Sequence, residues 1–261
     1  HETNVALGNP VLFSHEGVLW CFYVKVFGNS WEYARLYCQR SHDLGRTWEQ
    51  ELPFPQPESR HPTGTMSATR PLVLRNGDFL VPLNRESYDP DPKKQWYSLF
   101  LISSDRGKTW RETTPLYSKP GNIQPAVEQL DDGSLIAFFR PRGLRGFLWT
   151  SHSRDNGRTW DPLKKTNIAN PSARVGLGRL ANGNLVMAFN DDPERRTPLN
   201  LALSTDGGRS WPIRRAIEIG GWAFTYPYVL VTRSGHIHII YDDNREAIKH
   251  AVVDEAWFQQ R

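Results

Sequence analysis

The sequence contains little sulfur. It has two cysteines, Cys21 and Cys38, and two methionines among its 261 residues. Two cysteines are too few for a disulfide scaffold, and their spacing matches no metal-binding motif. Because Cys21 lies in the apolar run VLWCFYV, we expect a buried and unreactive thiol there. The composition therefore predicts neither a disulfide-stabilised fold nor a bound metal.

Long apolar runs and a strong charge excess are also absent. No apolar run approaches the roughly 20 residues that a membrane-spanning helix needs, so no membrane span is expected. The amino-terminal HETNVALGNPVLF has no basic segment followed by a long apolar one, so no signal peptide is visible and the compartment stays open. Lysine and arginine total 32 against 28 acidic residues, an excess too small to indicate nucleic-acid binding. It fits better with a local basic pocket for an anionic ligand.

What the sequence does have is a repeated phrase, Ser-x-Asp-x-Gly-x-(Thr/Ser)-Trp. It occurs four times, as SHDLGRTW, SSDRGKTW, SRDNGRTW and STDGGRSW, with its aspartates at Asp43, Asp105, Asp155 and Asp206. An aspartate accepts hydrogen bonds from the backbone of its own turn, and glycine adopts a positive φ at little cost. The Thr or Ser is expected to begin the next strand, with the Trp packed beneath the turn. The phrase thus predicts a stapled hairpin turn and not a catalytic or metal site.

A second recurring element precedes each phrase, namely two apolar runs joined by a turn with glycine, as in PAVEQLDDGSLIAFF. Such pairs of runs are hairpin signals, and helical periodicity is nearly absent. Each repeat is therefore interpreted as four short strands, and units of this length indicate a β-propeller. The sequence predicts one all-β domain over residues 1–261 with five blades of four antiparallel strands. The blades are expected to begin near Asn9, Arg70, Gln124, Ser172 and Tyr226.

The phrase resembles the Asp-box, and the whole chain resembles the sialidase (neuraminidase) family of bacterial neuraminidase repeat propellers. The resemblance implies a sialidase-like propeller of six blades, whereas five are visible here. Either the first blade is missing from this chain or the propeller closes with five blades, and the former is favoured. In the family the first blade supplies one carboxylate-binding Arg and the acid/base Asp. The implied activity is hydrolysis of a terminal sialic acid from glycoconjugates, with no cofactor.

The resemblance also implies which residues hold the carboxylate of the sugar, a task that suits the planar fork of arginine. Arg140 in LIAFFRPRG and Arg196 in NDDPERRTPLNLALS match two of the family's three arginines. Arg142 and Arg195 are the neighbouring alternatives. Tyr226 in FTYPYVLV matches the family's tyrosine nucleophile, and the competing interpretation is a core tyrosine at the start of a strand.

The sequence departs from the family pattern at the residue expected to act as the general base. The family has a Glu near the start of the blade that carries the second Arg, but this chain has Gln124 there, and an amide cannot take a proton. Glu128 in the same strand is one substitute. Glu86 is another, because the repeat alignment places it almost where Arg140 stands in its own blade. Both are also explained as solvated or ion-paired carboxylates.

Two further arginines are candidates for binding the substrate. Arg70 opens its blade as Gln124 opens another, and Arg245 follows the second strand of the last blade. The main hypothesis is thus an exo-glycosidase acting on a carbohydrate that bears a carboxylate. The alternatives are a hydrolase or lyase for uronate-containing polysaccharide, which Gln124 favours, and a non-catalytic glycan-binding propeller.

Overall fold

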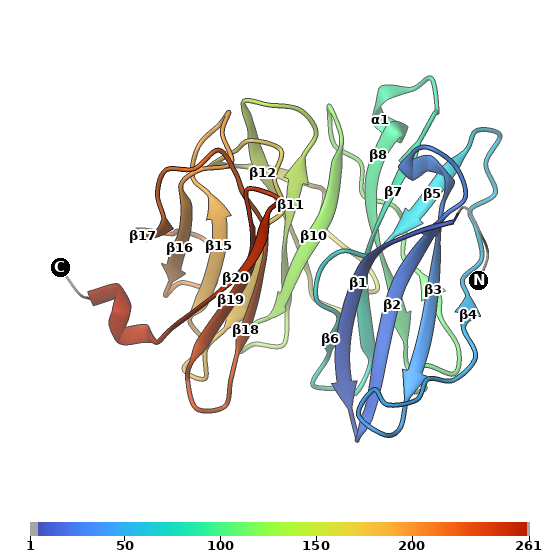
Figure 1. Ribbon diagram of the computed structural model, residues 1–261, viewed down its shortest axis with the longest axis horizontal. Helices are drawn as coiled ribbons and strands as arrows, with labels where there is room; N and C mark the ends of the chain where they lie inside the picture. The colour runs from blue at the N-terminus through green and yellow to red at the C-terminus, as the bar shows by residue number, and fades with distance from the viewer. Residues whose placement is uncertain (1–4, 260–261) are drawn as a thin grey trace. The chain divides into compact units, whose positions relative to one another are not determined.

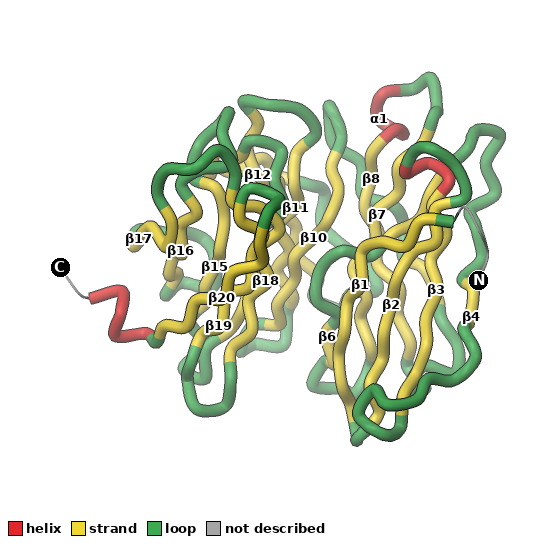
Figure 2. Tube along the Cα trace, in the orientation of Figure 1, coloured by secondary structure: helices red, strands yellow, loops and turns green. Residues whose placement is uncertain are grey.

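The computed structural model describes residues 5–259 and consists almost entirely of antiparallel strands and turns (Figures 1 and 2). The chain divides into two compact units. Unit 1 comprises His1–Pro125 and Asn156–Thr159, and unit 2 comprises Ala126–Asp155 and Trp160–Arg261. The boundary falls within one strand, β10, and within one Asp-box turn.

Unit 1 contains two sheets. The first has the strand order β1 (Ala6–His15), β2 (Val18–Val26), β3 (Ala34–Ser41), β4 (Leu52–Pro53). The second contains β5 (Thr63–Met66), β6 (Leu72–Val73), β7 (Phe79–Ser87), β8 (Trp96–Ser103) and β9 (Arg111–Glu112), and both β5 and β6 pair with β7. The connections include the short helices η1 (Trp31–Tyr33) and α1 (Pro92–Gln95). Arg70, expected to open the second blade, instead lies in the break between β5 and β6.

Three sheets follow. One has the order β10 (Asn122–Gln129), β11 (Leu135–Pro141), β12 (Gly146–Ser153), β13 (Lys164–Asn170). The next has the order β14 (Gly176–Arg179), β15 (Leu185–Asn190), β16 (Leu199–Ser204), β17 (Ile213–Glu218). The last contains β18 (Phe224–Val231), β19 (Ile237–Asp243) and β20 (Ala247–Val253). Within residues 5–259 this last sheet has three strands where the repeat predicted four, because the chain after β20 forms the short helix η2 (Glu255–Gln259).

Every second residue of a strand faces the same way, and this alternation determines which side chains are buried in the core. In β2, Trp20, Phe22, Val24 and Val26 are buried while the residues between them are half-buried. Among the described residues, one cluster of buried apolar side chains lies in unit 1 and two lie in unit 2. β15 of unit 2 is buried along its whole length, which fits a strand in the middle of its sheet that is covered on both faces.

The two cysteines form no disulfide; Cys38 is buried and Cys21 half-buried. Burial raises the pKa of both thiols, that of Cys38 to about 12. A raised pKa disfavours the reactive thiolate at both positions. The burial expected for Cys21 is only partial, because its side chain is half-buried.

The Asp-box phrase forms a turn that satisfies its own polar groups. Ser103 Oγ, Thr109 N and Thr109 Oγ1 all donate to the Asp105 carboxylate, over 2.7, 2.9 and 2.5 Å. Gly107 N donates to Ser103 Oγ over 2.7 Å, and Gly107 has a φ of +80°. These hydrogen bonds, first of all the one from the Thr109 hydroxyl, lower the pKa of Asp105 to about 2. The predicted stapled turn is confirmed.

Two details of the phrase differ from the prediction. The Thr or Ser does not begin the next strand, because its hydroxyl and backbone N–H are both bound to the aspartate, as at Thr47 and Ser210. The outer strands begin further along the chain. The tryptophans also differ, since Trp211 is 5% exposed and packs edge-on against Phe138, whereas Trp48 is 37% exposed.

Candidate functional site

Arg140 and Arg196 lie at the blade ends opposite the Asp-box turns. In the third blade Leu135 pairs with Ser153, the first residue of its Asp-box, and Phe139 pairs with Trp149 near the other end. In the fourth blade Leu185 pairs with Ser204, and Asn190 pairs with Leu199 at the far end. The register therefore separates each arginine from the Asp-box of its own blade by the length of a strand.

Ser172, between β13 and β14, brings the two predicted arginines together within unit 2. Arg140 Nε donates to Ser172 Oγ over 3.2 Å, and a terminal nitrogen of Arg196 donates to Ser172 O over 2.9 Å. Both arginines are half-buried, while Arg195 is exposed. Of the two adjacent arginines, it is Arg196 that reaches Ser172.

Tyr226 lies on a bulge in the first strand of the last sheet. Thr225 pairs with Asp242 and Tyr228 with Ile240, so the register shifts between them. Tyr226 has a φ of 53° and is 40% exposed. Bulges of this kind turn a side chain away from the regular alternation. The exposure excludes the interpretation of Tyr226 as a core residue.

Arg174 is a residue that the sequence analysis missed. Its guanidinium carbon lies 5.3 Å from the centroid of the Tyr226 ring, and a terminal nitrogen donates to Tyr226 O over 2.5 Å. Burial lowers the pKa of Arg174 to about 10, and the charge of Arg140 acts in the same direction. Arg174 is still a cation at neutral pH, so its positive charge and that of Arg140 act on each other.

A positive φ recurs at the residues that introduce these blades. Gln124, Ser172 and Tyr226 have φ values of 52°, 56° and 53°, a region that non-glycine residues enter at a cost. In unit 2 the carbonyl groups of Ser172 and Tyr226 each accept a hydrogen bond from an arginine, Arg196 and Arg174 respectively. The arginines therefore hold the unusual backbone in place as well as supplying positive charge.

The carboxylate candidates lie in different units. Glu128 is buried in β10, the first strand of the blade that contains Arg140, and belongs to unit 2. Glu86 is half-buried near the end of β7 in unit 1. Its neighbour Arg85 is buried and forms an ion pair with Glu112 over 2.6 Å. Arg85 thus has an acidic partner other than Glu86.

The remaining predicted residues are placed as follows. Gln124 is buried in β10 and Arg70 is half-buried, both in unit 1. Arg245 lies in the turn after β19 with a φ of 61°, and its guanidinium carbon is 5.6 Å from the Trp222 ring centroid. Across residues 5–259 no group of three or more His, Cys, Asp or Glu side chains is arranged to bind a metal. None of the described helices is long and apolar enough to span a membrane.

Comparison with known proteins decides the family. The model of the BNR repeat-like domain matches residues 1–239. The chain belongs to this family. It is 22% identical over 195 residues to the sialidase of Clostridium perfringens, covering 72% of this chain and 48% of that protein. With the sialidase of Micromonospora viridifaciens it shares 23% identity over 171 residues, covering 60% of this chain and 25% of that protein.

Solved structures show the same fold. The Hadza microbial sialidase Hz136 has a TM-score of 0.81 at 21% identity, covering 97% of this BNR chain and 53% of its own. Trypanosoma rangeli sialidase in complex with sialic acid has a TM-score of 0.75 at 17% identity, covering 98% and 45%. The predicted sialidase-like β-propeller fold is thus confirmed. The BNR chain spans about half the length, or less, of these relatives.

Proposed function

We propose that this BNR propeller is a sialidase-like exo-glycosidase, which removes a terminal acidic sugar from a glycoconjugate. The observation that carries the proposal is the convergence of Arg140, Arg174 and Arg196 around Ser172 and the exposed Tyr226. Guanidinium groups from different blades suit a carboxylate, and a partly exposed tyrosine beside them suits chemistry at the adjoining carbon. The two named curated relatives are both sialidases.

In the proposed reaction Arg140 and Arg196 hold the sugar carboxylate. The Tyr226 oxygen attacks the anomeric carbon, the bond from that carbon to the leaving-group oxygen breaks, and a covalent glycosyl–tyrosine intermediate forms. A water molecule then attacks the same carbon and releases the sugar and Tyr226. A neutral phenol suits this role because an anionic nucleophile would be repelled by the carboxylate of the sugar.

Two proton transfers accompany these steps. The phenolic proton passes to a carboxylate, for which we propose Glu128, because it is buried in the first strand of the blade that contains Arg140. The leaving-group oxygen takes its proton from a general acid. Arg174 positions the Tyr226 backbone, and its positive charge stabilises the negative charge that develops on the phenolic oxygen.

The test compares sialic acid release from sialyllactose by the wild-type protein, Tyr226→Phe and the control Tyr37→Phe. Tyr37 lies in β3 of unit 1, where its ring packs beside Tyr23. We expect Tyr226→Phe to reduce the rate by at least about 100-fold, the order of effect of removing a nucleophile, while Tyr37→Phe changes little. Isothermal titration with sialic acid should show retained binding in Tyr226→Phe.

Two results would contradict the proposal. Release that is unaffected by Tyr226→Phe would remove the tyrosine from the mechanism. Release of a uronate from a uronate-containing oligosaccharide, with none of sialic acid, would favour the uronate-acting alternative that Gln124 suggests.

A further inference from the structure

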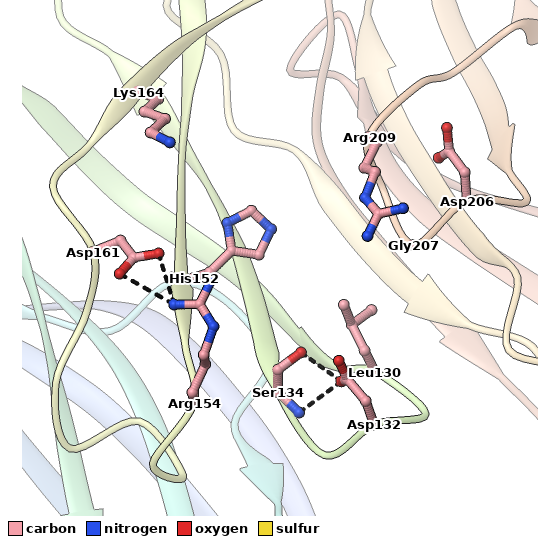
Figure 3. A pocket seen from close by; sticks show the side chains of 10 residues that line it. All are labelled: Leu130, Asp132, Ser134, His152, Arg154, Asp161, Lys164, Asp206, Gly207 and Arg209. Atoms are coloured by element: carbon pink, nitrogen blue, oxygen red, sulfur yellow. Dashed lines mark hydrogen bonds and ion pairs between the residues drawn. The ribbon is translucent and has the colours of Figure 1, made fainter.

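A polar cavity lies in unit 2, at the Asp-box ends of the third and fourth blades. It has a volume of about 320 Å³ and is lined by the turn after β10, by the end of β12 and by the Asp-box turn that contains Arg209 (Figure 3). None of its lining residues belongs to the group around Tyr226. We call it the rim pocket.

The rim pocket contains cationic side chains that differ in how they are paired. Arg154 is held by Asp161, whose two carboxylate oxygens lie 3.2 and 3.4 Å from one guanidinium nitrogen. Lys164 and Arg209 are exposed, and in the part of the chain that the structure describes neither forms an ion pair. Figure 3 shows Arg209 on one side of His152 and Lys164 on another. Two positive charges are therefore available to a ligand.

His152 marks the centre of this charge distribution. Burial lowers the pKa of His152; Asp161 opposes the shift, and the charges of Arg154, Lys164 and Arg209 reinforce it. The imidazole is therefore neutral at neutral pH, with one nitrogen that donates and one that accepts a hydrogen bond. An anion entering the pocket would raise the pKa of His152, because it would offset the surrounding cations.

The acidic side chains of the rim pocket are bound within their own turns. Asp206 accepts hydrogen bonds from Ser204 Oγ and Ser210 Oγ over 2.8 and 2.6 Å. Asp132 accepts from the backbone nitrogen and the hydroxyl of Ser134 over 2.9 and 2.5 Å. These carboxylates balance the formal charge of the pocket, but their hydrogen bonds fix them to their turns. Their remaining acceptor positions suit hydroxyl groups and not a second cation.

The size and lining of the pocket indicate one class of ligand. A volume near 320 Å³ lies at the lower end of small-molecule sites, which span about 300–1,000 Å³. Leu130 supplies an apolar wall, Lys164 and Arg209 supply a place for an anion, and the carboxylates and His152 suit hydroxyls. A pyranose ring with one acidic group has all three features.

We propose that the rim pocket is a second, non-catalytic binding site for one acidic sugar residue, whose anionic group is attracted by the positive charges of Lys164 and Arg209. The proposal is independent of the reaction assigned to Tyr226, because the two sites share no residue. It gives a glycan-processing propeller a separate contact with an anionic glycan, which would raise the local concentration of substrate by multivalent attachment.

Ligand binding to the rim pocket can be measured through the NMR signals of His152. Imidazole resonances of protein with labelled histidine are followed by NMR during titration with glucuronate, N-acetylneuraminate, methyl glucoside or sodium sulfate, at constant ionic strength. The chain has eight histidines, so His152→Gln serves to assign the signal. We expect both sugar acids to shift the His152 resonance in a saturable way and to raise its pKa. Methyl glucoside, which lacks the charge, should bind much more weakly.

Matched variants locate the effect. Lys164→Gln and Arg209→Gln should each weaken binding by about 5–10-fold, as expected for loss of a charge-assisted hydrogen bond, and the double variant should abolish the shift. Arg233→Gln, which removes an exposed charge from a turn of the last blade, should bind normally. Tyr226→Phe should leave the His152 titration unchanged, which separates this site from the proposed catalytic one.

Three results would overturn the proposal. The first is the absence of a saturable shift with either sugar acid. The second is a shift that persists in the double variant, since the anion would then lie elsewhere. The third is sulfate binding as tightly as the sugar acids, because the ring and hydroxyls would then contribute nothing and the pocket would be a simple anion site.

Discussion

The two ends of the blades in unit 2 differ in where their polar groups find hydrogen-bond partners. At the Asp-box end, Ser204, Asp206, Gly208 and Ser210 satisfy one another within a single turn. At the other end, Arg174 reaches a carbonyl 52 positions along the chain, and Arg196 one that is 24 positions away. The Asp-box turn satisfies its polar groups from within one phrase, whereas the arginine end depends on contacts between residues far apart in the chain. Substitutions at the two ends should therefore affect different measurements.

The largest effect is expected at the arginine end, on activity. Arg196→Lys keeps the charge but removes the planar fork that holds a carboxylate, and we expect kcat/KM for sialyllactose to fall by about 100-fold, or about 2.7 kcal/mol. Arg195→Lys, at the exposed neighbour, is the matched control. Equal losses in the two variants would argue against a specific role for Arg196.

A smaller effect is expected at the Asp-box end, on stability alone. Gly208 has a φ of +86°, and a Cβ there would lie 2.7 Å from Ile136 Cδ1. Gly208→Ala should lower the free energy of unfolding by about 2 kcal/mol through backbone strain and overpacking. Urea denaturation followed by tryptophan fluorescence measures the change.

Gly207→Ala separates the two causes. Gly207 also has a positive φ, of +73°, but its nearest contact would be Leu130 Cδ1 at 3.6 Å. Only the strain remains, so the loss should be about 1 kcal/mol. Identical losses for the two glycine variants would exclude the steric contribution of Ile136.

The smallest effect is a pH dependence of stability. The hydrogen bonds of the turns lower the pKa values of Asp43 and Asp105 from the ordinary 3.8 to about 2. A lowered pKa in the folded state stabilises the protein above the unfolded value, and this contribution is lost as the pH falls from about 4 to 2. Asp105→Asn should lower the Tm by about 2 °C at neutral pH and make the acid side of the Tm profile shallower. A steeper acid profile would contradict this assignment.

The same contrast explains what could be predicted from the sequence. The four phrases gave the strand order and the register, because each turn is determined by residues within the phrase. They also led to Glu86, Arg140 and Tyr226, since the register distinguishes one end of a blade from the other. Predicting roles for Arg140 and Tyr226 still required the family resemblance.

Arg174 escaped prediction for a physical reason. In SARVGLGRL it looks like an ordinary residue before a strand, and its importance depends on the bulge that places the Tyr226 carbonyl within reach. The only signal was its position just after Ser172, the counterpart of Gln124 and Tyr226 in the repeat alignment. Arg70 was misplaced for a related reason, since the break between β5 and β6 interrupts the repeat.

The closed Asp-box turns also bear on how the chain folds. A contact within one turn closes a short loop and forms early, whereas the contact of Arg174 with Tyr226 needs two blades to be in place first. We expect each hairpin to form on its own and the arginine cluster to assemble last. A fragment or a misassembled chain could then keep its Asp-box hairpins while lacking the binding site, so refolding is better judged by ligand binding than by the recovery of β-structure.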